Sequence, residues 1–215
     1  LVHQRYNHPS VLFWGIFAEP KLLGDDPIPF IREMNGIVKL LDPVRLTAGV
    51  SSQDGEVNRI TDPVVWHHAF GWKTGMPADI AIWRDQLHRD PVWNTVRSAV
   101  SYRAGGEAGQ YAAQLSRPDP VRGRHQENWQ AYVHEVHLAA LARDGAFWGV
   151  FVGDMFDHGS ARVQPATLRG VSDCGLVTYD RQVRKDAYWL YKANWNATEP
   201  FLHIVSARDG VRCDS

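Results

Sequence analysis

Short runs of large apolar residues alternate along the chain with segments in which apolar residues recur about every third or fourth position. The first pattern is typical of buried strands of roughly four to eight residues, and the second is typical of amphipathic helices. The apolar runs predict strands at residues 11–18, 46–50, 64–70, 96–102 and 147–153. The periodic segments predict helices at residues 30–41, 79–88, 128–143 and 181–196.

The alternation of strand and helix indicates an α/β fold with a parallel sheet, because each helix returns the chain to the start of the next strand. A closed barrel of this type needs eight strand–helix units and about 250 residues. Five strands in 215 residues cannot close such a barrel. The pattern therefore leaves two interpretations: an open sheet, or the last part of a barrel whose first three strands precede this sequence. In the second case the strand at 11–18 has an uncovered edge.

Composition excludes several classes of partner. The net charge of -1 gives no electrostatic basis for binding nucleic acid or an anionic membrane, and no apolar run approaches the ~20 residues that span a bilayer. The two cysteines do not form a disulfide framework. Nine tryptophans suit a carbohydrate cleft, where flat rings stack on sugars, although core packing is the simpler interpretation for any single one.

Chemically active side chains gather where the predicted strands end. The carboxyl ends of parallel strands meet at one edge of the sheet, which is where α/β proteins place their functional residues. A carboxylate, histidines and tryptophans at successive strand ends are typical of a glycosidase cleft. The strand-end residues are Ala18, Glu19, His67, His68, Phe70, Trp72, Ser101, Tyr102, Arg103, Asp154 and Asp157.

Several long motifs make the sequence recognisable. They include "RYNHPSVLFWGIFAEP" from residue 5, "FIREMNGIVKLLDPVRLTAGVS" from residue 30, "VVWHHAFGWK" from residue 64 and "GLVTYDRQVRKDAYWLYKANW" from residue 175. From about Leu1 to Ile204 the chain resembles the barrel domain of glycoside hydrolase family two, on its β-galactosidase side. The resemblance implies an incomplete (β/α)8 TIM barrel that comprises about the last five strand–helix units.

The resemblance also implies a domain organisation and a reaction. Residues 1–198 would be the C-terminal part of the barrel, and residues 199–215 would begin a following β domain or form a tail. Family members hydrolyse β-galactosides or related glycosides with retention, by means of two carboxyl groups about 5 Å apart. Glu19 falls at the acid/base position, although a capping or surface glutamate is the alternative. A carbohydrate substrate is implied, whereas no cofactor and no metal are. Upstream barrel strands and β domains would complete the protein, and an oligomer is left open.

The sequence departs from the family pattern at the positions that would do the chemistry. In the resemblance aligned without a gap, Ser101 stands at the position of the family's nucleophilic glutamate. With a one-residue deletion, Ser101 keeps its own place and the glutamate is missing. In either alignment no carboxylate precedes Tyr102. By resemblance, Ala18, His67, Ala69, Arg103 and Gly153 replace Asn, Asn, Tyr, Gly and Trp respectively. The positions that would contact substrate are Ala18, His67, His68, Trp72, Tyr102, Arg103, Gly153 and Asp154.

These departures leave two hypotheses about function. In the first, the protein is a β-galactosidase-like hydrolase with a non-standard nucleophile; Glu107 could swing in, since a serine attacks only with the help of a base. In the second, it is a degenerate homologue that binds sugar weakly or acts as a scaffold. Arg103 could pair with Glu19 and lower its pKa, or form an outward salt bridge.

Two histidine groups raise the question of a metal. The sequence "HEVH" at residues 134–137 lacks the HExxH spacing that puts two ligands on one helix face, so solvated helix residues are expected there. His67, His68, His158 and Asp154 could gather at the cleft mouth. Hydrogen bonds to a sugar or to neighbouring groups are the expected role for them, in preference to a metal site.

Overall fold

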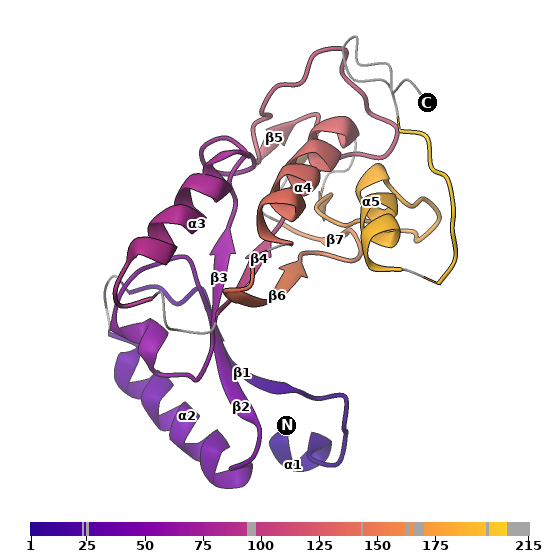
Figure 1. The fold of residues 1–215 in the computed structure, drawn as a ribbon. Helices are drawn as coiled ribbons and strands as arrows, with labels where there is room; N and C mark the ends of the chain where they lie inside the picture. The colour runs from indigo at the N-terminus through magenta and orange to yellow at the C-terminus, as the bar shows by residue number, and fades with distance from the viewer. Residues whose placement is uncertain are drawn as a thin grey trace. The chain divides into compact units, whose positions relative to one another are not determined.

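The computed structural model describes residues 1–22, 24, 26–93, 98–142, 144–161, 164–165, 170–196 and 198–205 (Figure 1). The chain divides into two compact units. The first, which we call the sheet unit, comprises residues 1–68, 87–101 and 145–151. The second, which we call the helical unit, comprises residues 69–86, 102–144 and 152–215.

Five strands form one sheet whose spatial order follows the order of the chain. The strands are β1 (Phe13–Ala18), β2 (Leu46–Ser51), β3 (Val64–His68), β4 (Ser98–Tyr102) and β6 (Phe147–Val152). β1 pairs with β2, and β2 with β3, in parallel. The parallel α/β sheet predicted from the apolar runs is therefore confirmed. Each strand lies within the predicted range or extends one residue beyond it, and residues 96–97 of the fourth prediction lie outside the described residues.

Helices connect the strands, and short two-residue strands decorate the loops. The helices are α1 (Val2–Arg5), α2 (Ile28–Leu41), the 3-10 helix η1 (Glu56–Arg59), α3 (Asp79–Arg89), α4 (Glu127–Leu141) and α5 (Asp186–Trp195). The short strands are β5 (Arg122–Gly123), β7 (His158–Gly159), β8 (Gln164–Pro165) and β9 (Val171–Ser172). β5 pairs with β8, and β7 with β9. No described helix is long and apolar enough to cross a membrane.

Two helices differ from the sequence prediction. α1 was not predicted, because four residues are too few to show a helical period. α5 begins five residues later than expected, at Asp186. The preceding residues form a turn instead, in which Arg181 has a left-handed backbone (φ 64) and the Thr178 amide donates to the Val183 carbonyl.

The sheet unit is packed by small and aromatic residues on neighbouring strands. Ala48, Val65 and Ala99 form its buried centre, and partly buried Phe13 and Trp148 pack against them with ring centroids 4.7 Å apart. In the same unit, β1 has β2 as its only neighbour among the described strands. The uncovered edge expected for the first strand is therefore present. Nearby large apolar side chains are exposed, namely Leu12, Leu40, Val44 and Leu46.

A buried carboxylate fixes the turn that leads into β2. Asp42 accepts hydrogen bonds from the Trp14 indole (2.9 Å) and the Arg45 guanidinium (2.7 Å), and also from the Val44 and Arg45 amides. Burial alone would raise the pKa of Asp42, but these hydrogen bonds outweigh it and hold the pKa well below its usual range. The hydrogen bonds that the Asp42 carboxylate accepts therefore hold the "LDPVR" turn, residues 41–45, in its conformation.

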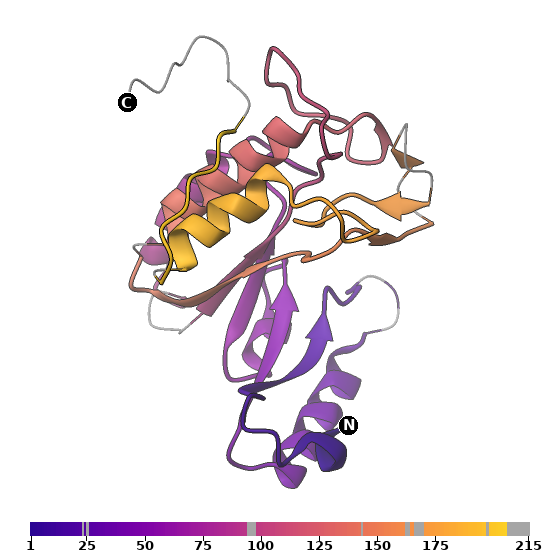
Figure 2. The same ribbon diagram turned by 90° about the vertical axis from the view of Figure 1, so that its right-hand side faces the viewer.

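In the helical unit, α4 and α5 lie side by side (Figure 2). Trp129, Val133, Trp72, Ala104 and Cys174 form its buried apolar cluster. Residues 198–205 contain no strand and run beside α5, where the Phe201 and His203 rings pack on Trp189. Residues 206–215 of the expected following domain lie outside the described residues, so that domain boundary stays a prediction.

His134 and His137 are fully buried in α4, so the expectation of solvated helix residues is wrong. α4 buries ten residues, and its polar side chains bond within the protein. His134 Nδ1 shares a hydrogen bond with the Tyr191 hydroxyl (2.8 Å), and His137 Nδ1 bonds to the Val133 carbonyl (2.8 Å). Because burial penalises the charged form, the pKa falls to about 3 for His134 and to about 4 for His137.

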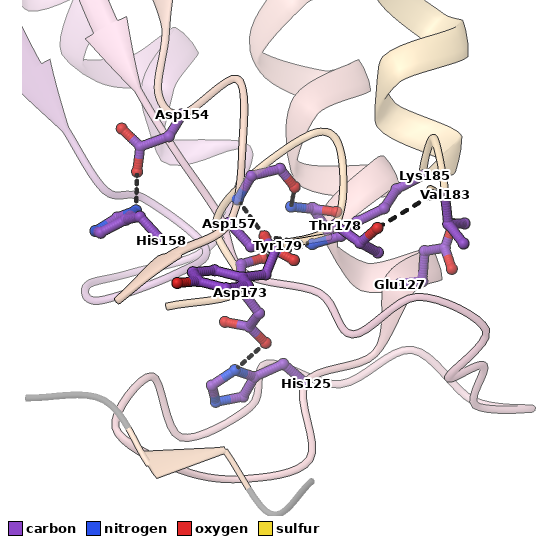
Figure 3. Close-up of polar contacts among 12 residues, drawn as sticks. His125, Glu127, Asp154, Asp157, His158, Asp173, Thr178, Tyr179, Val183 and Lys185 are labelled. Atoms are coloured by element: carbon purple, nitrogen blue, oxygen red, sulfur yellow. Dashed lines mark hydrogen bonds and ion pairs between the residues drawn. The ribbon is translucent and has the colours of Figure 1, made fainter. Parts of the chain in front are cut away.

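A buried ion pair joins the loops of the helical unit (Figure 3). The Lys185 ammonium donates to Asp157 Oδ1 (2.8 Å) and to the Asp173 carbonyl (2.9 Å). The Gly175 amide donates to the same Asp157 oxygen (2.8 Å). A side chain at position 175 has no room, since a Cβ there would lie 2.0 Å from the Asp157 amide nitrogen.

The buried histidines predict a pH dependence of stability. Their folded pKa values lie below the ordinary 6.5, so between pH 6.5 and about 4 only the unfolded chain binds these protons. Stability is therefore full above pH 6.5 and falls on acidification, by about 1.4 kcal/mol per pH unit for each histidine. Urea unfolding across this range should show a shallower slope in His137→Gln than in the wild type. Exposed His3→Gln is the control, and equal slopes in all three proteins would contradict the prediction.

The buried ion pair predicts that removing its cation alone lowers the unfolding free energy more than removing both charges. Lys185→Met leaves Asp157 buried without its cation, which should lower the unfolding free energy by about 3–5 kcal/mol. Adding Asp157→Asn should recover part of that loss, because the remaining amide carries no charge. Urea unfolding of both variants checks this, with exposed Lys73→Met as the control. A loss below about 1 kcal/mol in Lys185→Met would mean that the pair is not a major constraint.

Candidate functional site

Glu19 stands directly after β1 with its side chain exposed. Its amide donates to the Val50 carbonyl (2.8 Å), and its Oε2 accepts a hydrogen bond from the Ser52 hydroxyl (2.6 Å). Its backbone is left-handed (φ 50), a conformation that non-glycine residues rarely adopt and that costs energy. Strained residues of this kind cluster at functional sites, so the geometry supports Glu19 as a site residue.

Ser101 and His67 form a hydrogen-bonded pair on neighbouring strands of the sheet unit. His67 Nδ1 and Ser101 Oγ lie 3.2 Å apart, and both residues are half-buried. The proton of this hydrogen bond belongs to either partner, depending on the histidine tautomer. The pair can hold a water molecule or a sugar hydroxyl, but it supplies no negative charge. Ala18 lies exposed next to Glu19, and His68 is half-buried at the end of β3.

Trp72 and Tyr102 lie in the core of the helical unit, away from solvent. Trp72 is 2% exposed and meets the His125 ring edge-on, with centroids 4.7 Å apart. Tyr102 is fully buried, and its hydroxyl bonds to that of Tyr191 (2.8 Å). Burial raises the pKa of the Tyr102 phenol well above its usual value. Neither ring has a face free for a sugar, so both are left out of the proposed binding surface.

Four residues of the helical unit lie around the loop that follows β6. Arg103 Nη1 is 3.9 Å from Asp154 Oδ2, and His158 Nδ1 is 3.5 Å from the same oxygen (Figure 3 shows the second contact). The Gly153 amide donates to the Tyr102 carbonyl (3.0 Å), which fixes the loop beside the end of β4. The ionic partner that the structure gives Arg103 is thus Asp154.

The structure fixes the position of the carboxylate that could have swung in to replace the nucleophile. Glu107 is 3% exposed, and its amide and carbonyl are bonded to His125 and Gln110 respectively, so it is a fixed residue of the buried interior. Within the described ranges, no three His, Cys, Asp or Glu side chains are placed to hold a metal ion.

Sequence reasoning missed several polar groups near these positions. Ser52 follows β2 and bonds to Glu19, so the strand-end rule could have identified it. The buried pair of His125 and Asp173 (2.7 Å) had no such signal, because the two residues are far apart in the sequence. Hydrogen bonding to Asp173 outweighs burial and raises the pKa of His125.

Comparison with known proteins identifies the relatives of this chain. The sequence model of "Glycosyl hydrolases family 2, TIM barrel domain" matches residues 1–199. A β-glucuronidase of Bacteroides fragilis is 39% identical over 213 residues, which are 99% of this chain and 30% of that protein.

Two solved structures resemble the fold over most of the chain. The FMN-binding β-glucuronidase from Facaelibacterium prausnitzii L2-6 is 31% identical with a TM-score of 0.84, over 94% of this chain and 31% of its own. A putative β-galactosidase from Bacteroides fragilis is 26% identical with a TM-score of 0.83, over 91% of this chain and 30% of its own.

The chain spans roughly a third of the length of these relatives. The matched residues include the five-stranded sheet and the helices that connect it. The chain therefore belongs to glycosyl hydrolase family 2, as part of the TIM barrel domain.

Proposed function

We propose that this chain forms the sugar-binding strand ends of a family 2 barrel in which the proton donor is kept and the attacking carboxylate is replaced. Glu19 is the proton donor, and the Ser101–His67 pair occupies the place of the nucleophile. The observation that carries the proposal is the 3.2 Å contact between Ser101 and His67, at the position where the resemblance puts a glutamate. The protein therefore binds β-glycosides and hydrolyses them slowly.

The chemistry explains why turnover is slow. Retaining hydrolysis needs one carboxyl group to protonate the leaving oxygen and a second to attack the anomeric carbon. A neutral hydroxyl stabilises the oxocarbenium-like transition state poorly, because it carries no charge. Loss of a covalent nucleophile costs orders of magnitude in rate in other enzymes, about 10⁶-fold in one well-studied protease.

Glu19 retains what a proton donor needs. Its carboxyl group is exposed at a strand end, and the Ser52 hydroxyl orients one of its oxygens. The other oxygen is free to carry the proton that the leaving group takes. A general acid of this kind contributes roughly 10²–10⁴-fold to a rate.

The sequence motifs and the relatives favour different sugars as the substrate. The sequence motifs favour β-galactosides, and a relative named a putative β-galactosidase shares the fold. β-Glucuronides are the second choice, because the more similar relatives carry the name β-glucuronidase.

We further propose that residues 1–198 are the C-terminal part of the barrel and that residues 199–215 lead into a following domain. The exposed edge of β1 would then pair with a preceding strand.

A second candidate is full hydrolysis with a carboxylate supplied from outside this chain. It is favoured by the 39% identity to a β-glucuronidase of which the chain covers 30%. The two candidates are distinguished by the effect on turnover of restoring the nucleophilic carboxylate by mutation or replacing it with an added anion.

Ser101→Glu should raise hydrolysis by at least about 100-fold, since it restores the missing charge and the attacking group. The measurement uses the full-length protein with chromogenic β-galactoside and β-glucuronide. Azide added to the wild type should also raise turnover, because it attacks the anomeric carbon as the glycosidic C–O bond breaks, and leaves a glycosyl azide. Ser101→Ala is the control and should change little. Fast wild-type turnover that azide does not alter would favour a carboxylate from elsewhere.

Glu19→Gln should lower the azide-assisted rate by about 100-fold for a substrate with a poor leaving group. The leaving oxygen then lacks its proton donor, while a substrate with a good leaving group should be affected far less. Steady-state rates on two aryl glycosides of different leaving-group pKa measure this. Ser52→Ala is the matched change next to the carboxyl group and should cost less than Glu19→Gln. An equal loss on both substrates would contradict the proton-donor role.

A further inference from the structure

The backbone on both sides of Glu19 is held by β2 and the residues that follow it. On one side, the Glu19 amide donates to the Val50 carbonyl (2.8 Å). On the other side, the Gln53 side-chain amide donates to the Pro20 carbonyl (2.9 Å). The left-handed residue (φ 50) lies between these two hydrogen bonds. Because a residue in this conformation persists only where its surroundings fix it, the two bonds hold Glu19 in its strained state.

Pro20 limits the ways in which the Glu19 backbone could relax. A proline disfavours the right-handed helical conformation in the residue before it, and that residue then tends towards an extended backbone. A change in the φ and ψ angles of Glu19 would redirect its side chain and also move the Pro20 carbonyl relative to β2. The hydrogen bond from Gln53 to that carbonyl therefore resists the change that would turn the carboxyl group away.

Gln53 is suited to this task because its own backbone is fixed. Its carbonyl accepts hydrogen bonds from the Ser51 hydroxyl (3.0 Å) and the Asn58 side-chain amide (2.5 Å). Its amide donates to the same Ser51 oxygen (3.1 Å). Ser51 is fully buried, and Asn58 is almost fully buried. A side chain that starts from a backbone held in this way can deliver its hydrogen bond in a defined direction.

We propose that Gln53 is a positioning residue for the proton donor, and that it acts through the Pro20 carbonyl on the strained backbone of Glu19. This inference rests on the proposed function, that is, on proton donation by Glu19. Gln53 has a different task from Ser52, whose hydroxyl contacts the carboxyl group directly (2.6 Å). A general acid must lie within hydrogen-bonding reach of the leaving oxygen, so a small displacement of its backbone slows the transfer of the proton.

A positioning role and a purely structural role have different kinetic consequences. A residue that only supports the fold affects every substrate of the enzyme to a similar extent. A residue that positions Glu19 affects only the substrates whose leaving group needs the proton, and it affects kcat more than KM because the proton is transferred in the transition state.

The experiment measures azide-assisted hydrolysis by the full-length protein, with aryl β-galactosides and aryl β-glucuronides that carry a poor or a good leaving group. Gln53→Met removes the amide and keeps the length of the side chain. It should lower kcat about 10-fold on the poor leaving group and less than about twofold on the good one, with KM unchanged within about twofold. Gln53→Asn should behave in the same way, because its amide is one methylene too short to reach Pro20. Exposed Gln4→Met is the matched control and should behave as the wild type.

A double-mutant cycle with Glu19→Gln separates this inference from the proposed function. In the Glu19→Gln background, Gln53→Met should cost less than about twofold, because no proton donor is left to position. The same loss in both backgrounds or on both leaving groups, no loss in Gln53→Met, or failure of both Gln53 variants to fold would overturn the inference and leave Glu19 as the donor. Full activity of Glu19→Gln on the poor leaving group, or no azide-assisted turnover by the wild type, would overturn the proposed function and this inference together.

Discussion

The buried contact between Lys185 and Asp157 is the constraint on which the helical unit depends. It joins three segments that are distant in sequence: the loop after β6, the turn at residues 173–177 and the start of α5. Two charges in an apolar interior hold together only when both are paired, so these segments cannot move apart without exposing a bare ion. Asp154 and His158 lie on the same loop as Asp157, within four residues of it. The contacts of Asp154 with Arg103 and His158 thus lie next to this buried ion pair along the chain.

The sequence predicted the sheet well, because buried parallel strands are continuous apolar runs that stand out from polar connections. It failed where tertiary packing overrides the pattern. A hydrophobic pattern treats His134 and His137 as polar, and therefore as exposed. In the structure ten residues of α4 are buried, and both histidines are among them, with pKa values lowered so that the rings are neutral at pH 7. α5 starts later than predicted because Arg181 forms a turn with a left-handed backbone. The spacing of apolar residues gives no signal for such a backbone conformation.

The strand-end rule located the candidate site along each strand but not the direction of each side chain. Ser101 and Tyr102 are adjacent in β4, so their side chains point to opposite faces. Ser101 meets His67, whereas Tyr102 points into the core to meet Tyr191. Trp72 follows a turn in which its amide bonds to the Ala69 carbonyl, and the ring enters the apolar cluster. The family resemblance had the same limit, because a sequence motif indicates where a residue lies in the fold and does not indicate the direction of its side chain.

The left-handed backbone of Glu19 has a consequence for the stability of the sheet unit. Glycine adopts that conformation without steric cost, and asparagine does so more readily than glutamate, so either residue would be the more comfortable occupant by about 1 kcal/mol. Replacing Glu19 by glycine would therefore relieve backbone strain in the sheet unit, and it would also remove the carboxylate that accepts the hydrogen bond from the Ser52 hydroxyl. Stability and the presence of a carboxylate at the end of β1 are thus opposed at this one position.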